Sequence, residues 1–227
     1  MEAEGNQSHW IPLADLMTGL MMVFMLLTAA FMLKVEETTG AVVKNHEQTK
    51  QKLQIALGNE FGKDLKGWNA EFAGDLTIRF KDPNTLFATG SSDLTQRYKE
   101  QLRDFFPRYL RILNDKEFKD VVKEVRIEGH TSAHWTSSIS IMDAYLKNMR
   151  LSQERTRSTL EFLLGLDEIS GRTIWVIKTV TANGLSSSRA DQSNPTGSHN
   201  QRVEFKIVTT SDEKMSELAR QFTIGIK

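Results

Sequence analysis

The order of apolar and polar residues divides the chain into a long apolar segment, a polar segment and a mixed one. From Trp10 to Leu33 nearly every residue is apolar, and after Trp10 the only formal charge in this run is Asp15. At 1.5 Å per residue, a helix of this length measures ~34 Å, which exceeds the roughly 30 Å thickness of the hydrocarbon core of a bilayer. The pattern therefore predicts a transmembrane helix over residues 10–33.

The carboxylate of Asp15 is the unusual feature of this predicted span. An acidic side chain at the centre of a bilayer costs roughly 2.5–3.5 kcal/mol on insertion scales and is usually functional. Asp15 lies about one turn inside the span, so a tolerated polar residue near the interface is the alternative interpretation. Thr18 and Gly19 share its helix face, where a hydroxyl can hydrogen-bond and a glycine lets another helix approach closely. These neighbours favour a functional site at Asp15 and Thr18.

The segments on either side of the span are polar. Residues 1–9 contain no Lys or Arg, and together with the long apolar run this predicts an uncleaved anchor rather than a cleaved signal peptide. Residues 34–75 are charged and rich in Gln, and they carry a weak heptad repeat. We expect a helical stalk followed by a linker, with the helix interrupted by Gly58, Gly62 and Gly67.

The remaining residues, 76–227, have the mixed pattern of a compact α+β domain. Alternating and helically spaced apolar residues predict the order β-α-β-α-β-β, with helices on one face of a mixed sheet. Ser92 is expected to cap the first helix, Pro107 to interrupt or kink it, and the tail from Asp212 to form a short helix. The strands are expected at 76–80, 121–129, 174–181 and 201–208, and the helices at 94–113 and 151–164.

Composition narrows the classes of function. Lys and Arg number 29 and are balanced by 29 Asp and Glu, so no overall charge favours a nucleic-acid partner. The absence of Cys excludes disulfides and thiolate metal sites. The chain also lacks a nucleophile-elbow motif and a phosphate-binding loop. We therefore predict a protein that is not an enzyme and needs no cofactor.

The apolar segment resembles a known family. The string ADLMTGLMMVFMLL is similar to the single transmembrane helix of MotB-type stator subunits, which have an Asp, then Met-Thr, then an apolar run rich in Met and Phe. The resemblance implies that Asp15 carries the translocated H⁺ or Na⁺. It also implies a homodimer, with two copies inside a ring of five multi-helix, MotA-like partner subunits.

Four further strings resemble the OmpA-like peptidoglycan-binding domain, and they occur in the order found in that family. They are LFATGSSDL, IEGHTS, NMRLSQERTRS and NQRVEF. In the family, an Asp after Gly-His-Thr and the Arg of Leu-Ser-x-x-Arg clamp the charged groups of diaminopimelate in the peptide stem. The resemblance implies peptidoglycan as a partner, and a wall-binding site drawn from Thr131, Ser132, Asp143, Asn148, Leu151, Arg155, Asn200 and Arg202.

One position departs from this family pattern, because Ser132 stands where the family has its Asp. Either Asp143 folds back to replace that carboxylate, or the domain binds the wall differently, or it is purely structural. Trp135, in the inserted segment, either stacks on a sugar or packs against the domain. His130 and His134 have helical metal-ligand spacing with Asp143 as a third candidate, but His130 belongs to the Gly-His-Thr string, so we predict no metal site.

The acidic N-terminus and the divergent wall-binding loop make the chain more similar to the B subunits of Zorya anti-phage systems, whose partner is ZorA-type, than to flagellar subunits. The alternatives are a flagellar MotB-type stator subunit and a passive peptidoglycan tether. The resemblance places the chain in the bacterial inner membrane, with its N-terminus cytoplasmic and its C-terminal domain periplasmic. Lysine counting gives the opposite orientation. The lysines that follow the span are Lys34, Lys44, Lys50 and Lys52.

Overall fold

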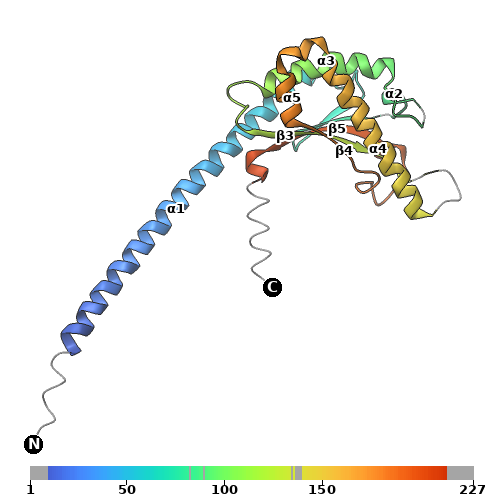
Figure 1. Ribbon diagram of the computed structural model, residues 1–227. Coiled ribbons are helices and arrows are strands. Elements are labelled where there is room, and N and C mark those ends of the chain that lie inside the picture. The colour runs from blue at the N-terminus through green and yellow to red at the C-terminus, as the bar shows by residue number, and fades with distance from the viewer. Residues whose placement is uncertain (1–9, 82, 89, 134, 136–139, 214–227) are drawn as a thin grey trace, which may run out of the picture. The chain divides into compact units, whose positions relative to one another are not determined.

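The computed structural model describes residues 10–81, 83–88, 90–133, 135 and 140–213 (Figure 1). The chain forms two compact units, Met1–Glu47 and Gln48–Lys227, which are considered separately below. The helix expected from Asp212 onward lies largely outside the described residues.

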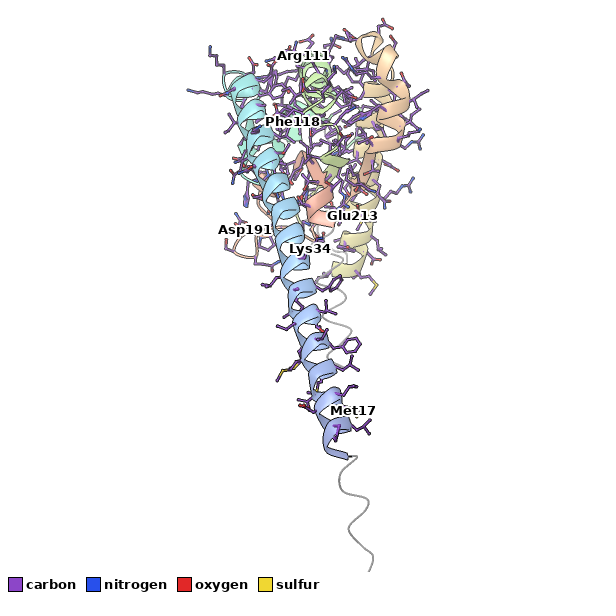
Figure 2. All side chains as sticks on the ribbon, turned by 90° about the vertical axis from the view of Figure 1, so that its left-hand side faces the viewer. Met17, Lys34, Arg111, Phe118, Asp191 and Glu213 are labelled. Atoms are coloured by element: carbon purple, nitrogen blue, oxygen red, sulfur yellow. The ribbon has the colours of Figure 1, made fainter. Side chains whose placement is uncertain are left out.

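The first unit contains the N-terminal part of helix α1 (Trp10–Phe61). Within it, Pro12–Lys34 is long and apolar enough to cross a membrane, and its side chains are exposed along the whole segment. Figure 2 shows these side chains, with Met17 and Lys34 labelled towards the two ends of the segment. The structure thus has one candidate membrane span among its described residues, and it overlaps the expected span.

The second unit is built on a five-stranded sheet with the strand order β1-β2-β5-β3-β4. Strands β3 and β4 are parallel, and the other neighbouring pairs are antiparallel. The sheet is therefore mixed, as predicted. The strands are β1 (Ala70–Ala73), β2 (Thr77–Lys81), β3 (Val122–His130), β4 (Val180–Gly184) and β5 (Arg202–Thr209).

The two faces of this sheet differ in polarity because side chains alternate along each strand. Ile78, Ile127 and Phe205 are buried on the face covered by helices. Helices α3, α4 and α5 lie on one side of the sheet in Figure 1. Charged residues occupy the alternate positions and form the other face, among them Arg79, Glu124, Arg126, Glu128, Glu204 and Lys206.

The helices of this unit are α2 (Pro83–Leu86), α3 (Gln96–Leu113), α4 (Ile141–Leu164) and α5 (Thr173–Thr179), with 3₁₀ turns at Asp167–Arg172 and Ser198–Asn200. The prediction that Ser92 caps α3 is wrong, because the Thr95 hydroxyl accepts the amide of Tyr98 at 3.1 Å. The predicted interruption at Pro107 is also wrong, since α3 runs through it. The side chains of Phe106 and Tyr109 are fully buried on either side of the proline, and their packing offsets the lost backbone hydrogen bond.

A cluster of aromatic rings forms the centre of the core. The ring centre of Phe105 lies 5.1 Å from that of Phe61 and 5.0 Å from that of Phe205. Phe61 belongs to the end of α1, and Leu57 in the same helix is also buried. Because the last turns of α1 and strand β1 contribute to this unit, it begins at Gln48 rather than at the expected Leu76.

The strand expected at residues 174–181 is wrong over most of its length. Residues Thr173–Thr179 form α5, and β4 begins only at Val180. The segment is rich in β-branched residues, which favour strands, but propensity is weak against tertiary packing. Val176 and Thr179 are three apart and both buried, as on the inner face of a helix. The α+β class, with helices on one face of a mixed sheet, is confirmed.

Candidate functional site

Asp15 lies on the open surface of α1 in the first unit. The hydroxyl of Thr18 donates to the carbonyl of Ala14 at 2.7 Å, so it is satisfied within the helix. Apart from the adjacent backbone of its own helix, a Cβ placed on Gly19 would meet no atom within 4 Å. A carboxylate, a hydroxyl and a glycine on one helix face leave room for another helix to pack beside the carboxylate.

Arg155 is a buried charged residue of the second unit. It projects from the inner face of α4 and is only 7% exposed. Its Nε donates to the carbonyl of Ser91 at 3.0 Å, and its guanidinium carbon lies 4.8 Å from the ring centre of Phe87. Burial lowers the pKa of Arg155 to about 10. Among the described residues, no carboxylate forms an ion pair with it.

The surroundings of Arg155 are closely packed. The cavity beside it measures about 10 Å³, which is about the space of one water molecule. Strand β3 approaches α4 so closely that a Cβ on Gly129 would lie 2.7 Å from Thr156 Cγ2 and 2.8 Å from the Ser152 carbonyl oxygen. This explains the glycine of the Gly-His-Thr string. The cavity is lined by Leu86, Phe87, Gly129, His130, Ser152, Arg155, Arg202 and Val203.

Two buried carboxylates on the polar face of the sheet form an ion-pair network. Glu204 Oε1 accepts from Arg79 Nε at 2.7 Å and from Arg202 Nε at 2.5 Å. Glu128 Oε2 accepts from Arg189 Nη1 at 2.8 Å. The Nε2 atom of buried His130 lies 3.7 Å from Oε2 of both carboxylates.

Glu128, His130 and Glu204 have ligand atoms close enough to one another for a metal ion, all within 4.8 Å. However, three guanidinium groups already neutralise the two carboxylates, so a divalent cation would add positive charge to a cluster that has enough. We interpret the cluster as an ion-pair network that orients Arg202. Of the metal ligands considered from the sequence, His134 lies outside the described residues.

The pKa values of both carboxylates are shifted. Burial by itself would raise the pKa of Glu204. The hydrogen bond from Arg202 and the neighbouring positive charges lower this pKa by a larger amount, so the net shift is downward. The pKa of Glu128 is likewise lowered, since burial is outweighed by its contacts with His130 and Arg189. A carboxylate whose pKa is lower in the folded state stabilises the fold above its unfolded pKa. That contribution is lost as the pH falls through the folded value.

The domain is therefore expected to lose stability as the pH is lowered below about 4.3, the ordinary value for Glu. Each 1 kcal/mol lost corresponds to a fall of roughly 2–4 °C in the unfolding temperature of a domain this size. The measurement is thermal unfolding of the full chain between pH 7 and pH 3. Glu204→Gln should flatten the acid limb, whereas Glu124→Gln, an exchange at a more exposed glutamate of the same sheet, should not. An unchanged limb in Glu204→Gln would contradict the assignment.

Asp143 does not replace the carboxylate that Ser132 lacks. It is exposed in the first turn of α4, where its Oδ2 accepts from the Ser140 hydroxyl at 2.7 Å and its amide donates to Ser140 Oγ at 3.1 Å. This reciprocal cap starts α4 at Ile141, before the expected residue 151. Ser140 and Asp143 thus match the start-of-helix pattern of a capping pair.

The remaining predicted residues have different roles in the structure. Ser132 is buried and accepts a long hydrogen bond from Gln201 Nε2 at 3.4 Å. The amide of Thr131 donates to the Ser186 carbonyl at 2.9 Å. Asn200 holds its own loop, accepting from the Asp191 amide and donating to the Asn194 carbonyl, both at 2.8 Å. Asn148 is buried and Leu151 is partly buried on α4.

The structure therefore brings Arg155 and Arg202 to one cavity and leaves Asp143 outside it. Sequence reasoning missed Phe87, Ser91 and Gln201, which contact Arg155 or Ser132. Phe87 and Ser91 lie within the string LFATGSSDL. The family resemblance of this string drew attention to the segment, but it did not predict which residues contact Arg155.

The fold and these sites define a class: within its described residues, the chain has one candidate membrane span, which bears the carboxylate of Asp15, followed by an α+β domain with a buried arginine. No family model matches the sequence. The Zorya protein ZorB of Escherichia coli is 38% identical over 225 residues, which cover 95% of this chain and 94% of that protein. The chain therefore belongs to the ZorB family.

Three solved structures are similar in fold. The OmpA-like domain of FopA1 from Francisella tularensis is 19% identical and covers 62% of this chain and 81% of its own, with a TM-score of 0.39. The cell wall anchor of the T6SS from Pseudomonas aeruginosa is 20% identical, with 67% and 96% covered and a TM-score of 0.46. The periplasmic domain of Helicobacter pylori MotB is 15% identical, with 70% and 91% covered and a TM-score of 0.42.

Proposed function

We propose that this chain is the ion-translocating and wall-anchoring subunit of a stator-type rotary motor in the inner membrane, acting in Zorya anti-phage defence. The observation that carries the proposal is the lone carboxylate of Asp15 on the open face of an apolar span, in a member of the ZorB family. A passive anchor has no use for a carboxylate that raises its insertion cost.

Asp15 acts by alternating between charged and neutral forms. Binding of H⁺ or Na⁺ from one side neutralises the carboxylate, and release to the other side restores the charge. Each elementary charge that crosses 100 mV releases about 2.3 kcal/mol, which is available to drive rotation. One helix cannot enclose a conducting path, so a ZorA-type partner with several membrane helices is required. We propose two copies of this chain within a ring of five such partners.

The C-terminal domain holds the motor to peptidoglycan. The Arg155 site supports this part of the proposal, because a guanidinium can donate two parallel hydrogen bonds to a carboxylate of the peptide stem. Arg202 is held beside the same cavity by Glu204. Ser132, Thr131, Asn148, Leu151 and Asn200 shape the surroundings, and Asp143 takes no part in the contact.

The assembly is tested by purifying the affinity-tagged full chain in mild detergent. A multi-helix membrane protein is expected to copurify, and native mass measurement should give a ratio of five partners to two copies. Recovery of the chain alone from cells that express the whole defence locus would support the passive tether instead. Sedimentation of the purified chain with peptidoglycan sacculi tests the wall contact separately.

We expect the C-terminal domain to be periplasmic. Two of the lysines that argue for the opposite orientation belong to the folded unit, where Lys50 pairs with Asp212 at 2.9 Å and Lys52 with Glu117 at 2.7 Å. The positive-inside rule concerns short loops next to a span, so these two carry little weight. Reporters that are active only in the cytoplasm or only in the periplasm, fused after Lys227, measure the orientation. A cytoplasmic signal would exclude both the stator and the tether.

A further inference from the structure

The two edges of the sheet differ in how they are shielded from other chains. At edge strand β1, the amide of Ala70 donates to the carbonyl of Leu65 at 2.8 Å, outside the sheet. Glu71 of the same strand is charged and pairs with Arg79 at 2.7 Å. A charged side chain and a covered backbone are two means by which natural edge strands avoid pairing with other chains. Strand β1 is therefore a protected edge.

Strand β4 forms the other edge and has a different character. Its five residues, Val180–Gly184, include no charged residue and no Pro. Its register with β3 runs through without a bulge. The side chains of Thr181 and Ala182 are exposed. A flat, uncharged strand of this kind is a template on which a further strand can pair.

The backbone of β4 offers hydrogen-bonding groups to such a strand. The amide of Leu185 donates to the carbonyl of Gly129 in β3 at 2.9 Å. Because backbone groups alternate in direction along a strand, those of Thr181 and Asn183 also face β3, and those of Ala182 point away from the sheet. Among the described residues, no backbone hydrogen bond joins Ala182 to a segment outside the sheet.

This edge is complementary to a second copy of itself. When two β4 strands lie antiparallel about a twofold axis at Ala182, the amide of each Ala182 donates to the carbonyl of the other. Thr181 of one copy then lies opposite Asn183 of the other. Within one chain, the Asn183 side-chain amide donates to the Thr181 hydroxyl at 3.0 Å, so these two groups are chemically matched. Since the strand has no charge, no like charges meet across the pair.

The small size of this edge favours a tethered occupant. Stable complexes between free proteins bury roughly 800 Å² on each partner, which is more than a strand of this length provides. Two copies held in one ring of partner subunits have an effective concentration on the order of millimolar, and at that concentration a small contact suffices. A second copy in the same motor meets this condition, whereas a free protein does not.

We propose that β4 of one copy pairs antiparallel with β4 of a second copy, so that the two sheets form one continuous sheet across a twofold axis at Ala182. This inference rests on the proposed function, which places two copies of the chain in each motor. It adds the surface through which the two C-terminal domains meet.

The register of this pair is tested by disulfide cross-linking of two differently tagged full chains. The wild-type chain has no Cys, so the introduced thiols are the only ones it contributes. One copy carries Thr181→Cys and the other Asn183→Cys, both are expressed with the whole defence locus, and membranes are treated with a mild oxidant. In the proposed register the two Cα atoms lie about 4.5 Å apart, within the range of a disulfide.

Each cysteine variant expressed alone is the control. A residue and its own copy are then two positions out of register, about 7–8 Å apart, which is too far for a disulfide. The mixture is expected to give roughly ten times more linked dimer than either variant alone. Equal linkage in all three samples, no linkage in the mixture, or linkage of β4 to a different protein would overturn the inference.

A second substitution tests the pairing itself. Ala182→Lys in both copies brings two like charges together at the twofold axis, and we expect most of the linked dimer from the mixture to be lost. Gln192→Lys adds the same charge at an exposed residue outside β4 and should leave the linkage unchanged. Linkage that survives Ala182→Lys in full would contradict the proposed pairing.

Native mass measurement of the same complexes separates this inference from the proposed function. Two copies per complex without the mixed disulfide would overturn the inference and leave the proposed motor intact. The mixed disulfide in a chain that purifies without a multi-helix partner would support the inference and remove the stator. One copy per complex, without the disulfide, would overturn both.

Discussion

Asp15→Asn is expected to abolish anti-phage protection while expression, membrane insertion and partner assembly remain intact. The amide is nearly the same size as the carboxylate and still forms hydrogen bonds, but it does not exchange a proton at ordinary pH. Removing the charge also lowers the cost of insertion, so loss of function would not arise from misfolding. The measurement compares plaque formation on cells carrying wild-type and Asp15→Asn loci, with a pull-down of the partner from the same cells.

Thr18→Ala is the matched control on the same helix face. Its hydroxyl donates to the carbonyl of Ala14 within α1, so the substitution removes a local hydrogen bond and leaves the titrating group in place. We expect reduced but measurable protection. Full protection by Asp15→Asn would show that Asp15 carries no ion, and the passive tether would then be the better account of the molecule.

Arg155→Ala is expected to reduce sedimentation of the full chain with peptidoglycan. A hydrogen bond to a charged group contributes ~1.5–3 kcal/mol, which corresponds to a loss of roughly ten- to hundred-fold in affinity. Among the described residues, the buried guanidinium of Arg155 has no ion-pair partner. Its removal therefore leaves no carboxylate buried without a counter-charge, and the variant is expected to fold. The measurement is the fraction of protein that pellets with purified sacculi over a range of sacculus concentrations.

Arg150→Ala is the control for this experiment. Arg150 lies on the same helix α4, but it is exposed and pairs with Glu154 at 2.8 Å, one turn further along. Such surface pairs contribute little to stability, and the variant should sediment like the wild type. Thermal unfolding of both variants checks that each is folded. Equal sedimentation of Arg155→Ala and wild type would place wall binding at another site.

Period-two alternation correctly predicted much of the sheet from the sequence. The alternation in Leu76–Phe80 and Gln201–Val208 matches β2 and β5 to within one residue at each end. It does so because one face of the sheet is buried under helices and the other is charged, which leaves a clear pattern in the order of residues. The apolar run around Asp15 was equally plain, since a bilayer-length helix needs no tertiary contact to be recognised.

Local sequence signals were insufficient where the same residues are compatible with two different local structures. Ser92 and Thr95 are both good helix caps, and only the position of α3 in the fold selects Thr95. The β-branched segment Thr173–Thr179 suits a strand, yet burial of Val176 and Thr179 against the unit makes it helical.

The sequence by itself determined the class of the domain and the candidate span. It also identified Arg155 as the arginine of the Leu-Ser-x-x-Arg motif. The tertiary structure decided the charge balance around Arg155, where we propose wall binding, because that balance depends on which groups meet across the fold. In the sequence, nothing distinguishes Glu204 from other acidic residues. In the fold, Arg79 of β2 and Arg202 of β5 both form ion pairs with its carboxylate. Asp143 was a candidate replacement carboxylate until the start of α4 placed it in a cap, where its hydrogen bonds with Ser140 occupy it.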